Sequence, residues 1–261
     1  MNILVLGGTG AMGTPLVKLL SQYNEVFVTS RQNRYSENPH IYYIKGNAKK
    51  QSFLLPVLKT RMWDAIVDFM VWDTDFPMVL PLLLESTQQY VFISSARVYA
   101  KTDDIITEKT PRLLDVSDDR DYLATNEYAL AKAREEDLLS ELGRHNYTII
   151  RPTITYNNYR LQLGVLEKEN WLYRALHGRS IVFSNDIADK VTTMTWGDDV
   201  ALGISSVVGQ EKVLGEVFHV TSPVALKWRE VLNIYLDVLG LRGDFLWIPP
   251  PGENSMMVMR A

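Results

Sequence analysis

Cysteine is absent from the 261 residues of this chain. Disulfide bonds, thiolate metal sites and cysteine nucleophiles are therefore excluded, and a reducing compartment is the expected environment. Only four histidines occur, and none of them shows the spacing of a metal-binding motif. We predict no metal site.

Long hydrophobic runs and a strong excess of either charge are also missing. No stretch of 18 apolar residues occurs, and the apolar start of the chain meets Gly7 too early to form the core of a secretion signal. The 27 basic and 31 acidic side chains give a formal charge of −4, which provides no general attraction to nucleic-acid phosphates or anionic lipids. We therefore expect a cytoplasmic protein with neither a nucleic acid nor a membrane as its partner.

The composition that is present is that of a globular protein, with 46% hydrophobic and 22% charged residues. We find no internal repeat and no low-complexity segment. A chain of this length buries about three quarters of its unfolded surface, which is enough for one large core or for a main domain with a smaller one.

Short β-branched apolar runs alternate with longer stretches of helical spacing in the first 155 residues. The predicted strands are Ile3–Leu6, Val26–Thr29, Ile41–Ile44, Ala65–Phe69, Tyr90–Ile93 and Tyr147–Ile150, and the predicted helices are Met12–Gln22, Ser52–Arg61 (interrupted by Pro56), Pro77–Glu85 and about Tyr122–Leu142. Unbroken apolar runs of this length are typical of parallel strands that are buried on both faces. The alternation predicts an α/β fold with a doubly wound parallel sheet.

The pattern changes after Arg151-Pro152. Helical stretches near Val165–His177, Asp198–Val208 and Trp228–Leu239 mix with brief strand candidates at Ile181–Phe183, Val191–Thr195 and Val217–Val220. We predict a boundary near residue 155, with a smaller mixed α/β substrate region over residues 156–261 and with elements that can cross between the two regions. From Trp247 the tail shows no periodicity, and the sequence leaves open whether Ala261 is the natural end.

A glycine-rich turn joins the first predicted strand to the first helix, with the sequence Gly7-Gly8-Thr9-Gly10-Ala11-Met12-Gly13. Glycines at such positions allow a tight turn, a close approach of a pyrophosphate to the backbone, and close packing of helix on strand. The N-terminus of the following helix offers N–H donors and partial positive charge to phosphates. A tight turn without a ligand is the alternative, but the strand–turn–helix–strand context favours dinucleotide binding.

The end of the second predicted strand bears on which dinucleotide binds. An acidic residue there would bind the adenosine ribose 2′-hydroxyl, whereas an arginine accommodates a 2′-phosphate. The segment reads Ser30-Arg31-Gln32-Asn33-Arg34, and the next carboxylate is Glu37. Guanidinium groups suit phosphate, so we prefer NADP to NAD, with solvated loop arginines as the alternative.

Tyr128 and Lys132 lie four residues apart on a predicted helix, so their side chains share one face, about 6 Å apart along the axis. Ser94 and Ser95 end the fifth predicted strand, at the edge of the sheet where doubly wound folds bind ligands. Tyrosine has a pKa of about 10, so it acts as a base only where a nearby cation stabilises the phenolate. Ser95, Tyr128 and Lys132 therefore form a candidate catalytic set in which Tyr128 takes a proton from a substrate hydroxyl. The alternative is that both residues are structural, with the ring of Tyr128 packed against the protein and the ammonium of Lys132 solvated.

These features occur in one order along the chain, together with Phe92-Ile93-Ser94-Ser95, Thr107-Glu108-Lys109-Thr110-Pro111 and Ile150-Arg151-Pro152. Over about residues 1–220 the chain resembles the extended short-chain dehydrogenase/reductase family, in its NAD-dependent epimerase/dehydratase branch. The resemblance implies a Rossmann domain, a nucleotide-sugar substrate, an oxidoreductase, isomerase or dehydratase reaction by hydride transfer, and a homodimer. It also implies that Ser95 orients the substrate, Tyr128 acts as acid and base, and Lys132 anchors the ribose.

The motifs and the resemblance together assign three groups of site residues. The catalytic group is Ser95, Tyr128 and Lys132; the cofactor-binding group is Gly7, Thr9, Gly10, Ala11, Met12, Gly13, Ser30, Arg31, Asn47, Ala48, Phe69, Met70, Ser94, Tyr128, Lys132, Pro152, Thr153 and Ile154; and the substrate-binding group is Arg97, Asn157 and Arg160. The cofactor is NADP or NAD.

The chain departs from the family at several positions. Asn47 stands where the family often has an aspartate facing adenine, and Arg97 stands where smaller or acidic groups are common. The segment Asp68-Phe69-Met70-Val71-Trp72 is bulkier than the alanine-rich segment of sugar epimerases, and in this it resembles a subgroup of plastid RNA-binding relatives. A non-catalytic dinucleotide-fold protein that binds RNA is therefore the alternative function. We also expect Glu135-Glu136-Asp137 to form a solvated helix face.

Overall fold

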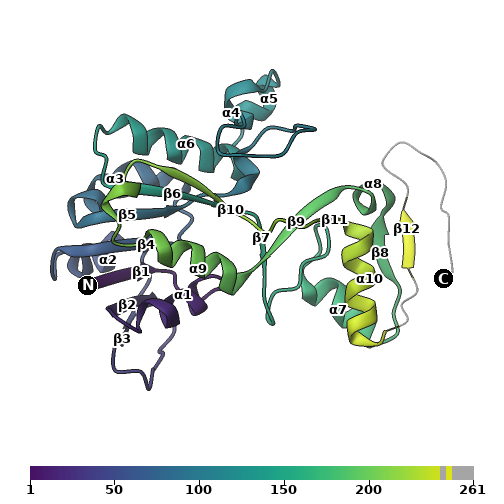
Figure 1. Ribbon diagram of the computed structural model, residues 1–261, viewed down its shortest axis with the longest axis horizontal. Coiled ribbons are helices and arrows are strands. Elements are labelled where there is room, and N and C mark those ends of the chain that lie inside the picture. The colour runs from purple at the N-terminus through teal and green to yellow at the C-terminus, as the bar shows by residue number, and fades with distance from the viewer. Residues whose placement is uncertain (242–244, 249–261) are drawn as a thin grey trace. The chain divides into compact units, whose positions relative to one another are not determined.

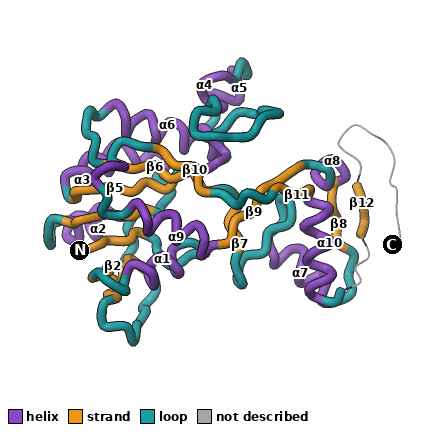
Figure 2. Tube along the Cα trace, viewed as in Figure 1, coloured by secondary structure: helices purple, strands orange, loops and turns teal. Residues whose placement is uncertain are grey.

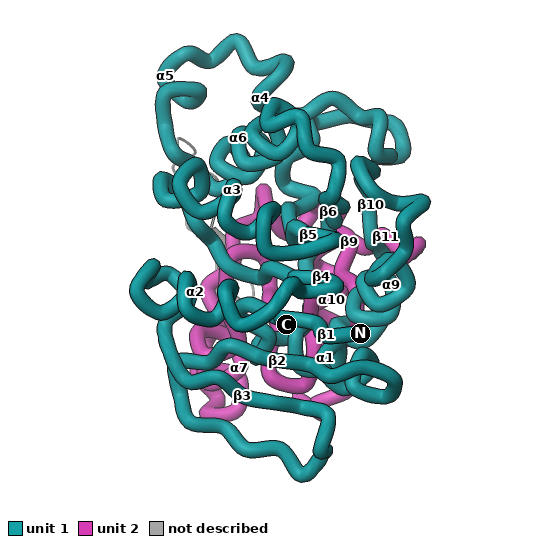
Figure 3. The backbone as a smooth tube through the Cα atoms, turned by 90° about the vertical axis from the view of Figure 1, so that its left-hand side faces the viewer, with its two compact units in different colours: residues 1–154, 197–221 teal, residues 155–196, 222–261 magenta. Residues whose placement is uncertain are grey.

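The computed structural model describes residues 1–241 and 245–248, and most of the tail that lacks periodicity lies outside these described residues (Figure 1). The chain forms two compact units (Figure 3). The first unit contains residues 1–154 and 197–221, and the second contains residues 155–196 and 222–261. The segment 197–221 therefore returns to the first unit after the chain has entered the second.

A seven-stranded parallel sheet forms the centre of the first unit. Its strands are β1 (Asn2–Leu6), β2 (Glu25–Ser30), β3 (Ile41–Lys45), β4 (Trp63–Asp68), β5 (Thr87–Ile93), β6 (Tyr147–Pro152) and β10 (Val217–Val220). The order across the sheet is β10-β6-β5-β4-β1-β2-β3, and every neighbouring pair is parallel. This confirms the predicted doubly wound parallel sheet. Of these seven strands β10 comes last in the sequence. It lies beside β6, with Val217 opposite Ile149.

Side chains of each strand alternate between the two faces of this sheet, as the period of a strand requires. Leu4 and Leu6 of β1 face the cluster formed with helices α2 (Gln51–Leu58), α3 (Phe76–Glu85) and α6 (Tyr128–Glu141). Ile3 and Val5 face the cluster formed with α1 (Gly13–Leu20) and α9 (Gly197–Val207). All four side chains are fully buried. Burial on both faces explains why the strand reads as an unbroken apolar run rather than as an alternation.

The helices of the first unit cover both faces of the sheet (Figure 2). They are α1 (Gly13–Leu20), α2 (Gln51–Leu58), α3 (Phe76–Glu85), α4 (Leu113–Val116), α5 (Arg120–Leu123), α6 (Tyr128–Glu141) and α9 (Gly197–Val207), with the short 3₁₀ turns η1 (Asp73–Asp75), η2 (Ala96–Val98) and η3 (Glu211–Val213). Among the described residues, no helix is both long and apolar enough to cross a membrane.

The long helix predicted over about Tyr122–Leu142 is divided in the structure. The short helix α5 ends at Leu123, and α6 begins only at Tyr128. The hydroxyl of Thr125 donates to the carbonyl of Tyr122 at 2.7 Å, and Glu127 caps the start of α6. Short polar side chains compete with the helical backbone for hydrogen bonds, so this prediction was wrong at the polar segment between the two helices.

The second unit contains two small sheets and three helices within the described residues. Its strands are β7 (Ile154–Tyr156, beginning at the last residue of the first unit), β8 (Ile181–Ser184), β9 (Val191–Trp196), β11 (Ala225–Lys227) and β12 (Phe245–Ile248), and its helices are α7 (Lys168–Leu176), α8 (Asn185–Ala188) and α10 (Trp228–Leu239). One sheet has the order β11-β9-β7, and β12 pairs with β8 in the other.

Three charged side chains, those of Lys132, Glu135 and Glu136, are buried on α6 beside its apolar residues. Glu135 and Glu136 are only 3% and 4% exposed, so the prediction of a solvated face was wrong for these two residues. Glu136 accepts two hydrogen bonds from Arg151 on β6, at 2.9 and 2.7 Å, and one from the hydroxyl of Ser94 at 2.6 Å. These two hydrogen bonds join α6 to β6. Both side chains are buried, so water does not compete for the bonds.

Removal of the carboxylate in Glu136→Ala should lower the free energy of unfolding by about 3–5 kcal/mol, because it leaves the guanidinium of Arg151 buried without its main partner. Urea denaturation followed by circular dichroism measures the change. Glu141→Ala, at the exposed end of the same helix, is the control and should change stability by less than about 0.5 kcal/mol. Equal effects of the two substitutions would contradict a stabilising role for the buried pair.

Candidate active site

The glycine-rich turn follows β1 and leads into α1. Gly7 has a φ of +74°, in the left-handed region that favours glycine, and its carbonyl accepts a hydrogen bond from the N–H of Thr9 at 2.8 Å. A Cβ on Gly13 would lie 2.6 Å from the carbonyl carbon of Gly8, so the helix can approach the turn this closely only with glycine there. A Cβ on Gly10 would meet no atom within 4 Å. Gly7 therefore permits the backbone conformation of the turn, and Gly13 permits the close packing of α1 against it. Gly10 faces open space.

A hollow of about 440 Å³ opens beside this turn, at the carboxyl ends of β1, β2, β3 and β4. Eight of the predicted cofactor-binding residues line it: Gly7, Thr9, Ser30, Arg31, Asn47, Ala48, Phe69 and Met70. A second hollow of about 450 Å³ adjoins it, shares three of these residues, and is also lined by Gln32 and Arg34. Gly10, Ala11, Met12 and Gly13 form the turn itself and the start of α1.

The charge around these two hollows suits a nicotinamide dinucleotide, which carries a pyrophosphate. Arg31, Arg34 and Lys49 line them, and within the part of the chain that the structure describes no carboxylate does. The first turn of α1 adds N–H groups and the positive end of the helix dipole. Lys49 was not predicted, although its place two residues after Asn47 could have suggested it.

Arg97, two residues after Ser95, contacts Tyr128 where α6 begins. The carboxylate of Glu127 caps this helix, accepting from the N–H of Ala129 at 2.7 Å, and pairs with Arg97 at 2.5 Å. The guanidinium of Arg97 lies 5.6 Å from the centre of the Tyr128 ring. The N–H of Arg97 donates to the hydroxyl oxygen of Ser95 at 3.2 Å. Arg97 thus contacts both the predicted base and the predicted substrate-orienting serine.

Lys132 lies one helical turn beyond Tyr128, but its ammonium is held in the protein interior. The side chain is 2% exposed, and Nζ lies 2.9 Å from Oε2 of Glu135 and 4.5 Å from the centre of the Phe92 ring. Among the described residues, no hydrogen bond or ion pair joins Lys132 to Tyr128. The structure therefore places Ser95 and Tyr128 around Arg97 and holds the third predicted catalytic residue in an ion pair with Glu135.

A buried carboxylate, Asp68, ends β4 near Lys132. It accepts hydrogen bonds from Nε1 of Trp72 at 2.6 Å and from the hydroxyl of Tyr90 at 2.7 Å. Burial raises the pKa of Asp68 and of Glu135, and the positive charge of Lys132 opposes the rise in both. Two carboxylates and one ammonium therefore share a buried cluster at the carboxyl edge of the sheet.

The other predicted cofactor residues of the first unit lie at the ends of β5 and β6. The hydroxyl of Ser94 donates to Glu136, so it is engaged in the buried pair with Arg151 described above. Pro152 ends β6 and is followed by Thr153 and Ile154. These positions lie at the carboxyl edge of the sheet, where doubly wound folds bind ligands.

Two of the predicted substrate-binding residues belong to the second unit. Asn157 and Arg160 pair with each other through backbone hydrogen bonds of 3.0 Å, in a tight turn after β7. The guanidinium of Arg160 forms an exposed ion pair with Glu167 at 3.2 Å. The first unit holds Arg97, and the second holds Asn157 and Arg160.

The sequence over residues 3–205 matches the NAD dependent epimerase/dehydratase family. The chain belongs to this family. Membership confirms the predicted resemblance to the epimerase/dehydratase branch, and the description of the family supports a nicotinamide dinucleotide as the cofactor.

Among curated proteins, this member of the epimerase/dehydratase family is similar to the chloroplast stem-loop binding protein of 41 kDa b from Arabidopsis thaliana. The two are 26% identical over 238 residues, which is 84% of this chain and 58% of the relative. The chain therefore spans little more than half the length of that relative.

Solved structures of nucleotide-sugar enzymes share the fold. A dTDP-glucose 4,6-dehydratase from Bacillus anthracis, solved in complex with NAD, superimposes with a TM-score of 0.73 at 19% identity and covers 100% of this chain and 88% of its own. A UDP-N-acetylglucosamine 4-epimerase from Methanobrevibacter ruminantium, in complex with UDP-N-acetylmuramic acid, has a TM-score of 0.76 at 16% identity and covers 97% and 86%. At these identities the likeness establishes the fold alone.

Sequence reasoning missed three carboxylates that organise this site in the epimerase/dehydratase fold: Asp68, Glu127 and Glu135. Asp68 directly follows a buried apolar run, and an acidic residue at the carboxyl end of a parallel strand could have been flagged. Glu127 immediately precedes the first helical residue of α6, a capping position. Glu135 lies three residues after Lys132, so the pair could be anticipated, but its burial could not.

Gly13→Ala should destabilise the protein by about 1–3 kcal/mol, because the added methyl group meets the backbone of Gly8 at 2.6 Å and forces α1 away from the turn. Gly10→Ala should leave stability unchanged within about 0.5 kcal/mol, since its Cβ enters open space. Thermal or urea unfolding of both variants measures the difference. Similar stability of the two would show that close packing at Gly13 is not required.

Proposed function

We propose that this chain is an NAD(P)-dependent oxidoreductase, epimerase or dehydratase that acts on a hydroxyl-bearing sugar nucleotide. The observation that carries the proposal is the arrangement of Ser95, Arg97 and Tyr128 on the first unit, which also contains the cation-lined hollow beside the glycine turn. The fold neighbours named above include nucleotide-sugar enzymes solved with NAD or with a uridine nucleotide. A homodimer and a cytoplasmic location stay predictions.

In this proposal Tyr128 is the proton acceptor for a substrate hydroxyl. The bound nicotinamide supplies the hydride acceptor and, in the reverse direction, the hydride donor. Tyr128, in its phenolate form, would take the hydroxyl proton as the C–H bond of the same carbon breaks and its hydride leaves for the oxidised nicotinamide, and Ser95 would donate a hydrogen bond to the developing carbonyl oxygen. The guanidinium of Arg97 lies 5.6 Å from the centre of the Tyr128 ring and is held there by its ion pair with Glu127.

Lys132 contributes in this proposal from the interior. Its ammonium is on the same face of α6 as Tyr128, and Glu135 holds it there. The negative charges of Asp68 and Glu135 partly offset the positive charge of Lys132, and the carboxylate of Glu127 likewise offsets that of Arg97. The assignment of Lys132 as ribose anchor therefore requires its ammonium to leave or share the pair with Glu135.

Tyr128→Phe should abolish turnover of a nucleotide-sugar substrate while keeping the fold and the dinucleotide-induced rise in melting temperature. The substitution removes only a hydroxyl from a ring that is 37% exposed, so little packing is lost. Loss of one acid–base group typically lowers the rate by about 10²–10⁴. Absorbance at the reduced-nicotinamide band and sugar product analysis measure the rate. Tyr122→Phe, which removes a hydroxyl bonded to Glu127, is the matched control. Full activity of Tyr128→Phe would exclude the assigned role.

We propose that the cofactor is NADP rather than NAD, because Arg31 and Arg34 line the hollow after β2 and no carboxylate lines it among the described residues. Arg31→Ala should weaken NADP binding about 10- to 100-fold, equivalent to losing a charge-assisted hydrogen bond of about 1.5–3 kcal/mol, and should change NAD binding little. Titration calorimetry with both dinucleotides tests this. Lys18→Ala, on the exposed side of α1, is the control. Equal losses for NADP and NAD would exclude a 2′-phosphate contact by Arg31.

Binding of an RNA stem-loop is the second candidate function, and it rests on the name of the Arabidopsis relative. The formal charge of −4 gives no overall attraction, so binding would depend on a local cluster such as Arg31, Arg34 and Lys49. A stem-loop RNA titrated at several salt concentrations discriminates the two functions. Tight binding with a steep salt dependence, together with no response to NADP or NAD, would favour the RNA-binding function.

A further inference from the structure

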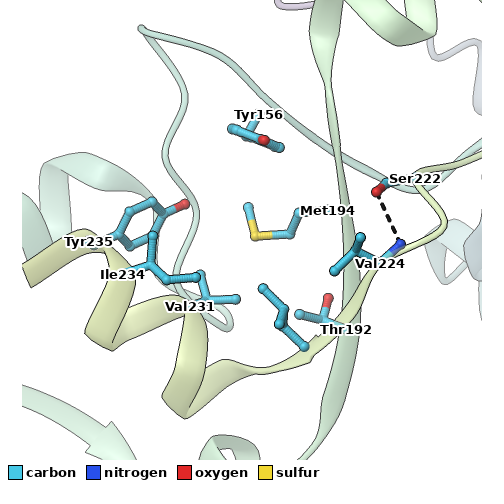
Figure 4. A pocket seen from close by; sticks show the side chains of 9 residues that line it. Tyr156, Thr192, Met194, Ser222, Val224, Val231, Ile234 and Tyr235 are labelled. Atoms are coloured by element: carbon cyan, nitrogen blue, oxygen red, sulfur yellow. Dashed lines mark hydrogen bonds between the residues drawn. The ribbon is translucent and has the colours of Figure 1, made fainter. Parts of the chain in front are cut away.

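The second unit contains a cavity of its own, with a volume of about 270 Å³ (Figure 4). Thr192 on β9 lies opposite Leu226 on β11, so the two side chains share one face of the small sheet. Val231, Ile234 and Tyr235 follow at helical spacing on α10 and form the facing wall. Every residue that lines the cavity belongs to the second unit.

The lining of this cavity differs in charge from the linings of the hollows of the first unit. Among the described residues, no lysine, arginine, aspartate or glutamate lines it. Transfer of a phosphate into such a site would leave the charge without a partner, at a cost of several kcal/mol. The lining therefore excludes a diphosphate and favours an uncharged ligand.

Two tyrosine rings form fixed walls of the cavity. Tyr235 stacks on Trp171 with ring centres 4.8 Å apart, and its hydroxyl donates to the carbonyl of Gln162 at 3.1 Å. Burial raises the pKa of Tyr235 to about 12, so this wall stays neutral at physiological pH. Tyr156 packs edge-on against Trp196, with ring centres 5.2 Å apart. Rings held in place before binding suit a planar partner, because little conformational entropy is lost on association.

Polar anchors in the cavity are few. The hydroxyls of Tyr156 and Thr192 make no hydrogen bond with any other described residue, so each can bind one polar atom of a ligand. The apolar side chains of Val224 and Ile234 are 57% and 48% exposed at the same site. A ligand with an apolar ring would cover them and remove this surface from water.

We propose that this cavity binds an uncharged, mainly apolar ring-bearing molecule, anchored by one hydroxyl or carbonyl group at Tyr156 or Thr192. The volume of about 270 Å³, just below the range of about 300–1,000 Å³ typical of small-molecule sites, suits one or two fused rings. The site goes beyond the proposed redox function, since it requires neither the dinucleotide nor Tyr128. A nucleobase is also an uncharged ring, but it carries more polar atoms than the two free hydroxyls of this cavity can bind.

Two methionines make the proposal directly measurable on the full chain. Met194 lines the cavity, and Met70 lines the hollow of the first unit, so ¹³C-methyl methionine spectra report on both sites at once. Met194→Leu and Met70→Leu assign the two signals. Titration with indole should shift the Met194 signal and leave the Met70 signal in place. Uridine, an uncharged nucleoside, should need at least a tenfold higher concentration than indole to shift the Met194 signal equally.

A blocking variant and its control lie on the same helix. Ile234→Trp places a larger side chain at the cavity, whereas Val238→Trp adds one at a position that is 79% exposed and lies outside the lining. The melting temperatures of both variants establish that they fold. Indole affinity, measured through Met194, should fall at least tenfold in Ile234→Trp and stay unchanged in Val238→Trp. Equal affinity in the two variants, stronger binding of uridine than of indole, or no shift of Met194 with indole would each overturn the proposal.

Discussion

Buried ion pairs on the inner face of α6 hold together the part of the first unit that carries the candidate chemistry. Lys132 pairs with Glu135, and Glu136 pairs with Arg151 of β6. A purely apolar helix face could slide or rotate at small cost, whereas a shift that separates a buried ion pair leaves its charges without a partner. The position of Tyr128, at the first turn of the same helix, follows from these pairs.

The carboxyl edge of the parallel sheet concentrates polar groups that are far apart in the sequence. The glycine turn after β1, the arginines after β2, Asp68 at the end of β4 and Ser95 after β5 all lie at this edge because neighbouring strands run in the same direction. The helix dipole of α1 and the nearby cations suit an anion, and the guanidinium of Arg97, paired with Glu127, lies beside the ring of Tyr128. One edge of the sheet therefore combines cofactor binding with acid–base chemistry in the proposed function.

The two units present opposite chemical environments to small molecules. Arginine and lysine line the hollows beside the glycine turn, whereas the cavity of the second unit is lined by tyrosine, aliphatic and hydroxyl side chains. Because an unpaired charge is costly to desolvate and an apolar ring gains from desolvation, the two environments select different chemical groups. In the two proposals the first unit therefore binds an anionic dinucleotide and the second an uncharged ring.

Local pattern determined much of this protein: the unbroken apolar runs predicted the strands of the parallel sheet, and the strand–turn–helix context predicted the glycine turn. These features are readable because burial on both faces and glycine's backbone freedom leave direct marks on neighbouring residues. Tertiary structure alone decided the rest. The strand β10 joins the main sheet after a long excursion, Lys132 and Glu135 are buried rather than solvated, and Arg97 is the cation beside Tyr128. Each of these depends on which segments meet in space, and a charged side chain has the same local sequence pattern whether its partner is water or another buried charge.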